Sequence, residues 1–108
     1  MSSLIDRLSN GKHRVKIDPR IEDMMFIKKR IEDGFVFIKF METNGGTELG
    51  VILDHSKSNF ETADFSTALG TINLTGTCTL DGVKVRCYAE IELNTKEGKG
   101  CIEIITYG

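Results

Sequence analysis

TINLTGTCTLDGVKVRCYAEIELNTKEGKGCIEIITY, residues Thr71 to Tyr107, is the stretch that decides the fold. Apolar and polar residues alternate along it with a period of two, which is typical of strands that bury one face. Asp81-Gly82 separates two such runs. This dipeptide favours a two-residue type I′ turn, because both central positions of that turn need positive φ. The stretch therefore predicts a β-hairpin followed by a return strand.

The two-residue turn also predicts the register of the hairpin. Leu80 faces Val83, and the same register places Ile72 opposite Ile91. The apolar residues of both strands then lie on one face of the sheet. Because a slip of one residue would move one strand's apolar set to the other face, we expect this register to be well specified.

The return strand is predicted over residues 101–107, after a polar connection at 94–99. Pairing Leu93 with Gly100 continues the apolar face across it. The opposite face is mostly polar, but it carries a small apolar cluster made of Tyr88, Cys101, Ile105 and Tyr107. Exposed apolar clusters often mark interfaces. These four residues are therefore interface candidates, and the alternative is that they are simply exposed or covered by a loop.

Upstream, the sequence predicts a short helix at residues 2–8, a charged edge strand at 12–17 and one main helix at 19–32. Asp18 would cap the main helix and Pro19 would occupy its first position, where the missing N–H costs nothing. The helix would turn an apolar face to the core, made of Ile21, Met24, Met25, Ile27 and Ile31 with Phe26 at its margin. Further runs at 35–41 and 48–53 predict a second hairpin.

Residues 54–70 are polar at first and then ambiguous between a strand and a short helix. Taken together, the elements predict an α+β fold: an antiparallel, curved β-sheet of about five to six strands packed on one main helix (19–32), with a short N-terminal helix. No repeat or linker divides the chain, so residues 1–108 are expected to form a single domain.

Composition excludes some classes of function. The net charge is −2 and there is no Trp, so nucleic-acid binding has no electrostatic support. No apolar run reaches the roughly 18 residues of a membrane-spanning helix, and the N-terminal residues do not resemble a signal peptide. We therefore expect a cytoplasmic protein that does not bind membranes.

The chemistry-bearing side chains form no complete motif. Three cysteines without an export signal predict free thiols, and zinc-ligand spacing is missing. Asp54 and His55, followed by Ser56, are weak catalytic candidates because they carry acid–base groups in one loop; the alternative is a solvated turn. His13 is expected to be structural. The sequence indicates no metal and no cofactor.

Two functions remain open. The first is a small soluble, non-enzymatic binding, accessory or assembly module that forms a homo-oligomer, most simply a homodimer. The second is a small enzyme or small-molecule-binding protein with its site at the 54–59 loop or at a dimer interface. The missing catalytic constellation and the outer apolar cluster favour the first.

Overall fold

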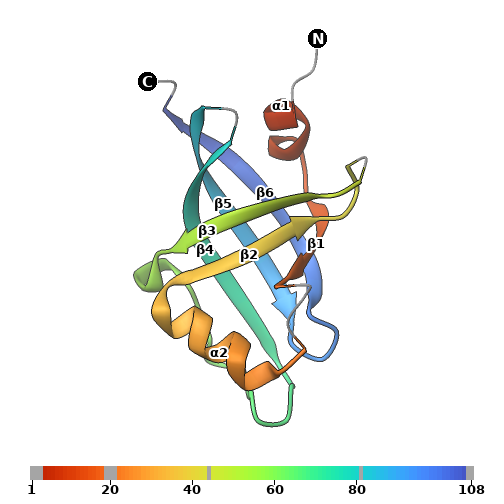
Figure 1. Cartoon of the computed structure of the whole chain (residues 1–108), viewed down its shortest axis with the longest axis vertical. Coiled ribbons are helices and arrows are strands. Elements are labelled where there is room, and N and C mark those ends of the chain that lie inside the picture. The colour runs from red at the N-terminus through yellow and green to blue at the C-terminus, as the bar shows by residue number, and fades with distance from the viewer. Residues whose placement is uncertain (1–3, 19–21, 44, 81, 107–108) are drawn as a thin grey trace.

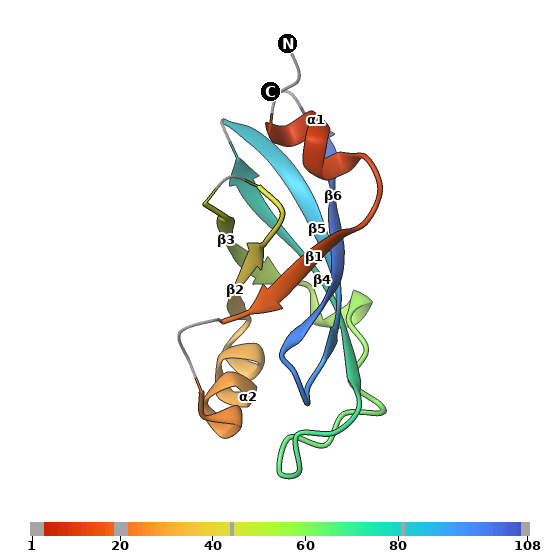
Figure 2. The ribbon, with the colours of Figure 1, turned by 90° about the vertical axis from the view of Figure 1, so that its right-hand side faces the viewer.

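The structure is a computed structural model that describes residues 4–18, 22–43, 45–80 and 82–106. In this part of the chain, six antiparallel strands form a closed barrel in sequence order (Figure 1). The strands are β1 (His13–Ile17), β2 (Phe35–Phe40), β3 (Thr47–Leu53), β4 (Thr71–Leu80), β5 (Val83–Glu92) and β6 (Glu97–Thr106). Helices α1 (Leu4–Ser9) and α2 (Met24–Asp33) lie at opposite ends of the barrel (Figures 1 and 2), and the 3-10 helix η1 (His55–Lys57) follows β3.

The predicted α+β fold, a sheet packed on one main helix at 19–32, is therefore wrong. The strand expected at an edge, β1, has a partner on each side: Val15 pairs with Phe40 of β2 and with Gly98 of β6. These pairings close the sheet, and a closed barrel has no edge strands that need a cover. Helix α2 consequently packs at one end of the barrel instead of forming a second layer.

Side chains fill the interior of the barrel. Helix α1 adds Ile5 and Leu8 to the buried core, and α2 adds Ile27 and Ile31. The most deeply buried strand residues are Val15, Ile17, Val36, Ile38, Phe40, Val51, Ile72, Val85, Cys87, Ile91 and Ile102. Small barrels commonly have interiors just wide enough for their own side chains. A binding site on this chain is therefore to be sought on the outer surface or beside the helices.

The predicted register of the first hairpin is confirmed. β4 and β5 pair from Thr71 opposite Glu92 to Leu80 opposite Val83. Gly82 has a φ of 77°, the positive value that the turn requires; Asp81 lies outside the described residues.

The predicted register of the return strand, β6, on β5 is wrong. Ala89 pairs with Gly100, whereas the prediction placed Gly100 opposite Leu93. The strand begins at Glu97 because a tight turn forms before it, in which the Lys96 N–H donates to the Glu92 carbonyl at 2.8 Å. The error spans an even number of residues, so the faces are unchanged: Ile102 is buried and Ile105 is exposed.

Helix α2 begins later than predicted. Asp23 is its N-cap, and the Asp23 carboxylate accepts a hydrogen bond from the Met25 N–H at 2.9 Å. The predicted core face is only partly correct: Ile27 and Ile31 are buried, but Met25 and Phe26 are 51% and 52% exposed. A ten-residue helix at the end of a barrel contacts the core along one narrow stripe. Pro19 and Ile21 lie outside the described residues.

The ambiguous segment 54–70 forms neither a long strand nor an α-helix. After η1 it continues as turns with two isolated bridges, Asn59 with Asn73 and Asp64 with Leu69. β3 pairs with β4 at Thr77 and Gly76. Next to these two pairs, residues of the 54–70 segment hydrogen-bond to β4 in place of β3: the Asp54 N–H donates to the Thr75 carbonyl at 2.8 Å. The segment therefore covers the part of β4 that β3 leaves unpaired.

Candidate functional site

The outer face of β4, β5 and β6 carries the interface candidates. Tyr88 lies in the middle of β5, opposite Thr75 of β4 on one side and Cys101 of β6 on the other. Tyr88 and Cys101 are partly buried, and Ile105, four residues along β6 from Cys101 on the same face, is 38% exposed. The fourth candidate, Tyr107, lies outside the described residues. Alternation along the strands thus brings three of the four candidates to one face.

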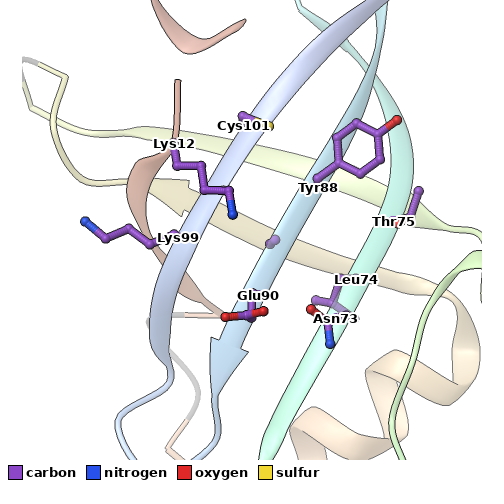
Figure 3. A pocket seen from close by; sticks show the side chains of 10 residues that line it. Lys12, Asn73, Leu74, Thr75, Tyr88, Glu90, Lys99 and Cys101 are labelled. Carbon is purple, nitrogen blue, oxygen red and sulfur yellow. The ribbon is translucent and has the colours of Figure 1, made fainter. Parts of the chain in front are cut away.

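A shallow depression of about 170 Å³ lies beside Tyr88 on this face (Figure 3). Its lining comes from the three strands and from Lys12, which precedes β1. Gly100 forms part of the floor, and a Cβ there would stand 2.6 Å from the Tyr88 carbonyl oxygen. The same Cβ would lie 3.1 Å from Val15 Cγ1 in the core, so the missing side chain lets β5 and β6 approach on the inner face of the sheet. Figure 3 shows the Tyr88 ring pointing away from Glu90, beside Thr75.

Charges are unevenly distributed along β5. Its outward residues on one side of Tyr88 are Lys84 and Arg86, and those on the other side are Glu90 and Glu92. On the neighbouring strand β6, the residue opposite Arg86 is acidic and the residue opposite Glu90 is basic; they are Glu103 and Lys99. The Arg86–Glu103 ion pair measures 3.5 Å between Nη1 and Oε1. The face is thus polar at both ends, with Tyr88 and Cys101 between them.

The cysteines are free thiols with little tendency to ionise. Burial raises the pKa of Cys87 to about 12. Burial also raises the pKa of Cys101, although the nearby Lys12 works in the opposite direction. Because the thiolate is the nucleophilic form, raised pKa values leave these thiols poorly reactive. The Cys101 thiol beside the depression is therefore not an activated nucleophile.

Asp54 and His55, the catalytic candidates, both make local structural contacts. The Asp54 carboxylate accepts hydrogen bonds from the Ser56 N–H at 3.1 Å and from the Ser56 hydroxyl at 2.6 Å. The hydroxyl bond is the main reason that the pKa of Asp54 is lowered. The His55 Nε2–H donates to the Ile31 carbonyl at 2.8 Å, because a carbonyl can only accept. The contacts found for these two described residues do not join them to each other.

A second depression lies between α2 and the segment after η1. It has a volume of about 230 Å³ and is lined by Lys28, Ile31, Glu32, His55, Phe60 and Phe65. A more polar depression of about 460 Å³ shares Lys28 and Phe65 with it. A site at the 54–59 loop was predicted from the sequence as an alternative, and His55 of that loop lines this depression. Phe60 and Phe65 were not part of that prediction, because the later part of 54–70 is ambiguous in sequence between a strand and a short helix. Phe60 and Phe65 were the available signal.

The buried ion pair between Asp18 and Arg30 was also not predicted from the sequence. Asp18 Oδ2 lies 3.4 Å from Arg30 Nε, and the Asp18 side chain is fully buried. Neither of these two atoms has a hydrogen-bond partner among the described residues. The other carboxylate oxygen accepts from the Phe37 N–H at 2.9 Å. The Arg30 guanidinium lies 5.2 Å from the centroid of the Phe37 ring. These contacts connect the chain before α2 with α2 and β2.

His13, expected to be structural, has partners on both ring nitrogens. Nδ1 lies 3.3 Å from a Glu42 carboxylate oxygen, and Nε2 lies 3.1 Å from the Asn10 carbonyl. Glu42 has a lowered pKa, chiefly because of its hydrogen bond with His13. These contacts hold the ends of β1 and β2 and the turn after α1 together.

Within the described ranges, no three His, Cys, Asp or Glu side chains gather closely enough to hold a metal ion. The helices of the described chain lack the length and apolar character needed to cross a membrane. No protein-family model matches the chain, and no curated protein matches it.

Proposed function

We propose that this chain is a small non-enzymatic assembly module that forms a homodimer through the outer face of β4, β5 and β6. The observation that carries the proposal is the position of Tyr88 and Cys101, which are neighbours on the outside of a barrel whose core is already complete, with Ile105 further along the same face. Residues on this face are not needed to fill the core, so their apolar surface is available to a partner. The Asp54 carboxylate is hydrogen-bonded to Ser56 and the His55 ring to the Ile31 carbonyl, so these two residues give no support to catalysis in their loop.

Tyr88→Lys or Cys101→Lys should weaken self-association at least tenfold, because each variant places a cation in the apolar centre of the interface. Sedimentation equilibrium over a range of concentrations measures the dissociation constant. Phe26→Lys is the matched control, since Phe26 is 52% exposed on α2, at the end of the barrel and outside β4, β5 and β6. Unchanged dissociation constants in both test variants, with the fold intact by circular dichroism, would exclude this face as the interface.

A second candidate function is binding of a small molecule in the depression between α2 and the segment after η1. Its support is the apolar lining by Ile31, Phe60 and Phe65, with His55 at its margin. Pockets of this kind combine apolar walls with few polar groups. A small molecule that co-purifies with the wild-type chain and is lost in Phe65→Ala would favour this function.

A further inference from the structure

The outward side chains of β5 have opposite charges on the two sides of Tyr88. Lys84 and Arg86 precede it, and Glu90 and Glu92 follow it at the same spacing. Suppose that a second copy of this strand lies over the first, antiparallel to it, with the two Tyr88 residues facing each other. Each basic side chain then faces an acidic side chain of the other copy. Arg86 then faces the partner's Glu90, and Lys84 faces the partner's Glu92.

From this pattern we propose that the dimer has a two-fold axis that crosses β5 at Tyr88, so that the two β5 strands are antiparallel and face each other. The inference rests on the proposed self-association and specifies its geometry. In an isologous interface the same patch is used by both subunits and must be complementary to itself. The outer row of β5 meets this condition only when the strand direction is reversed.

The neighbouring strand β6 supports the same axis independently. Cys101 lies beside Tyr88, while Glu103 and Lys99 lie two residues to either side of Cys101. The axis that crosses β5 at Tyr88 places Glu103 opposite the partner's Lys99 and Cys101 opposite the partner's Cys101. The outer rows of β5 and β6 are therefore each complementary to their own copies under the same two-fold axis. This holds although basic and acidic residues have opposite positions along the two strands.

The other two-fold arrangement of the same faces is unfavourable. With the β5 strands parallel, Arg86 would face the partner's Arg86 and Glu90 would face the partner's Glu90. Like charges brought together at an interface oppose association and act against the wrong geometry. The charge pattern thus discriminates between the two orientations.

The shape of the face fits the antiparallel arrangement as well. The depression lies on the Glu90 side of Tyr88, and the Tyr88 ring points away from Glu90 (Figure 3). Reversal of the strand direction brings each Tyr88 ring over the depression of the partner subunit. An aromatic side chain in a partner's pocket is a common anchor of protein interfaces.

The size of the face indicates a weak dimer. Ten-residue strands with a rise of about 3.4 Å per residue, spaced about 4.8 Å apart, give the three strands an area on the order of 500 Å². Two such faces bury about 1,000 Å² in total, which is near the lower limit for a specific interface. We therefore expect a dissociation constant in the micromolar range.

A charge-swap experiment tests the geometry. One variant carries Lys84→Glu and Arg86→Glu, and the other carries Glu90→Lys and Glu92→Lys. Each variant alone should have a dissociation constant at least about tenfold higher than that of the wild type, because all of its charged β5 contacts become repulsive. An equimolar mixture should recover a dimer, since one acidic row then faces one basic row. Sedimentation equilibrium gives the three dissociation constants.

The matched control is Lys29→Glu with Lys57→Glu. It changes the net charge as much as the first variant but lies on α2 and η1. Its dissociation constant should stay within about twofold of the wild-type value, because exposed charges outside an interface contribute little to its affinity. Thermal unfolding of all variants checks that the fold is intact.

Crosslinking of the unmodified chain provides a second measurement. Packed sheets lie about 10 Å apart, which is too far for a direct disulfide between facing cysteines but within reach of a short bis-maleimide. Applied at alkaline pH, because the thiolate is the reacting form, the reagent should link Cys101 to the partner's Cys101, and Cys101→Ser should remove the product. A wild-type dimer that gives no Cys101 crosslink, or whose charge variants dissociate like the wild type, would overturn the geometry and leave the proposed function intact. A wild-type chain that stays monomeric overturns the proposed function itself.

Discussion

At the residue scale, Asp18 is the most unusual side chain of the barrel. Its φ of 37° lies in the left-handed region, and its carboxylate is buried beside Arg30. Asp18→Asn keeps an acceptor for the Phe37 N–H, tolerates positive φ and removes the buried charge. We expect it to change the free energy of unfolding by less than about 1 kcal/mol, whereas Asp18→Ala should cost about 2–4 kcal/mol because the Phe37 N–H loses its acceptor and Ala disfavours this φ. Urea unfolding at neutral pH measures both, and an equal loss in the two variants would contradict this explanation.

The titration of Asp18 makes a separate prediction. Burial is the largest cause of its raised pKa, opposed by the Phe37 hydrogen bond and by Arg30 and Lys96, while Glu48 raises it further. The folded state therefore binds the Asp18 proton more tightly than the unfolded state does. This contribution to stability is complete below the unfolded pKa, near 3.8, and is lost as the pH rises through the folded pKa. The stability of the wild type relative to Asp18→Asn should fall over that window. A difference that stays constant with pH would contradict it.

The position and contacts of Asp18 can be predicted only in part from the sequence. Asp before Pro is a good helix-start signal, and it led to the wrong prediction that Asp18 caps α2. Nothing in the local pattern shows that the carboxylate turns inward toward Phe37, because its partners Arg30 and Phe37 come from later elements. A buried carboxylate with distant partners is defined by the tertiary fold.

At the scale of the element, α2 depends on Asp23. Asp23→Ala should lower the free energy of unfolding by about 1 kcal/mol, because the Met25 N–H loses its capping acceptor. Asp33→Ala is a matched control: within the described ranges its carboxylate has one partner, Lys29, in an exposed ion pair at 3.8 Å, and the change should cost less than about 0.5 kcal/mol. Chemical denaturation compares the two variants. Equal effects would show that the Asp23 cap contributes little to the stability of the fold.

The strands show where local sequence determines pairing. The β4–β5 register could be predicted because a two-residue turn leaves one choice of pairing. The β5–β6 register could not, because a longer turn allows several pairings that keep the same faces, and the charged residues Glu97 and Lys99 resemble a loop. The faces themselves follow from alternation, which is why Tyr88, Cys101 and Ile105 were placed correctly on the outside.

At the scale of the whole molecule, the closure of the barrel could not be predicted from local sequence patterns. It depends on pairs such as His13 with Gly100, which join the two ends of the chain, and alternation does not identify the partner of a strand. The short, charged β1 therefore resembled an edge strand. The candidate site was predicted in part: the apolar centre of the outer face follows from the pattern, while the depression beside Tyr88 depends on how β4, β5 and β6 lie together.

The most direct test of the proposed self-association is native mass spectrometry of the wild-type chain, purified without added ligands and measured from low to high micromolar concentration. The proposal predicts a species of twice the 12.0 kDa chain mass, without bound small molecules, whose share grows with concentration. A bound small molecule on a monomer would favour the depression between α2 and the segment after η1. A bare 12.0 kDa monomer at every concentration would contradict the proposed assembly function.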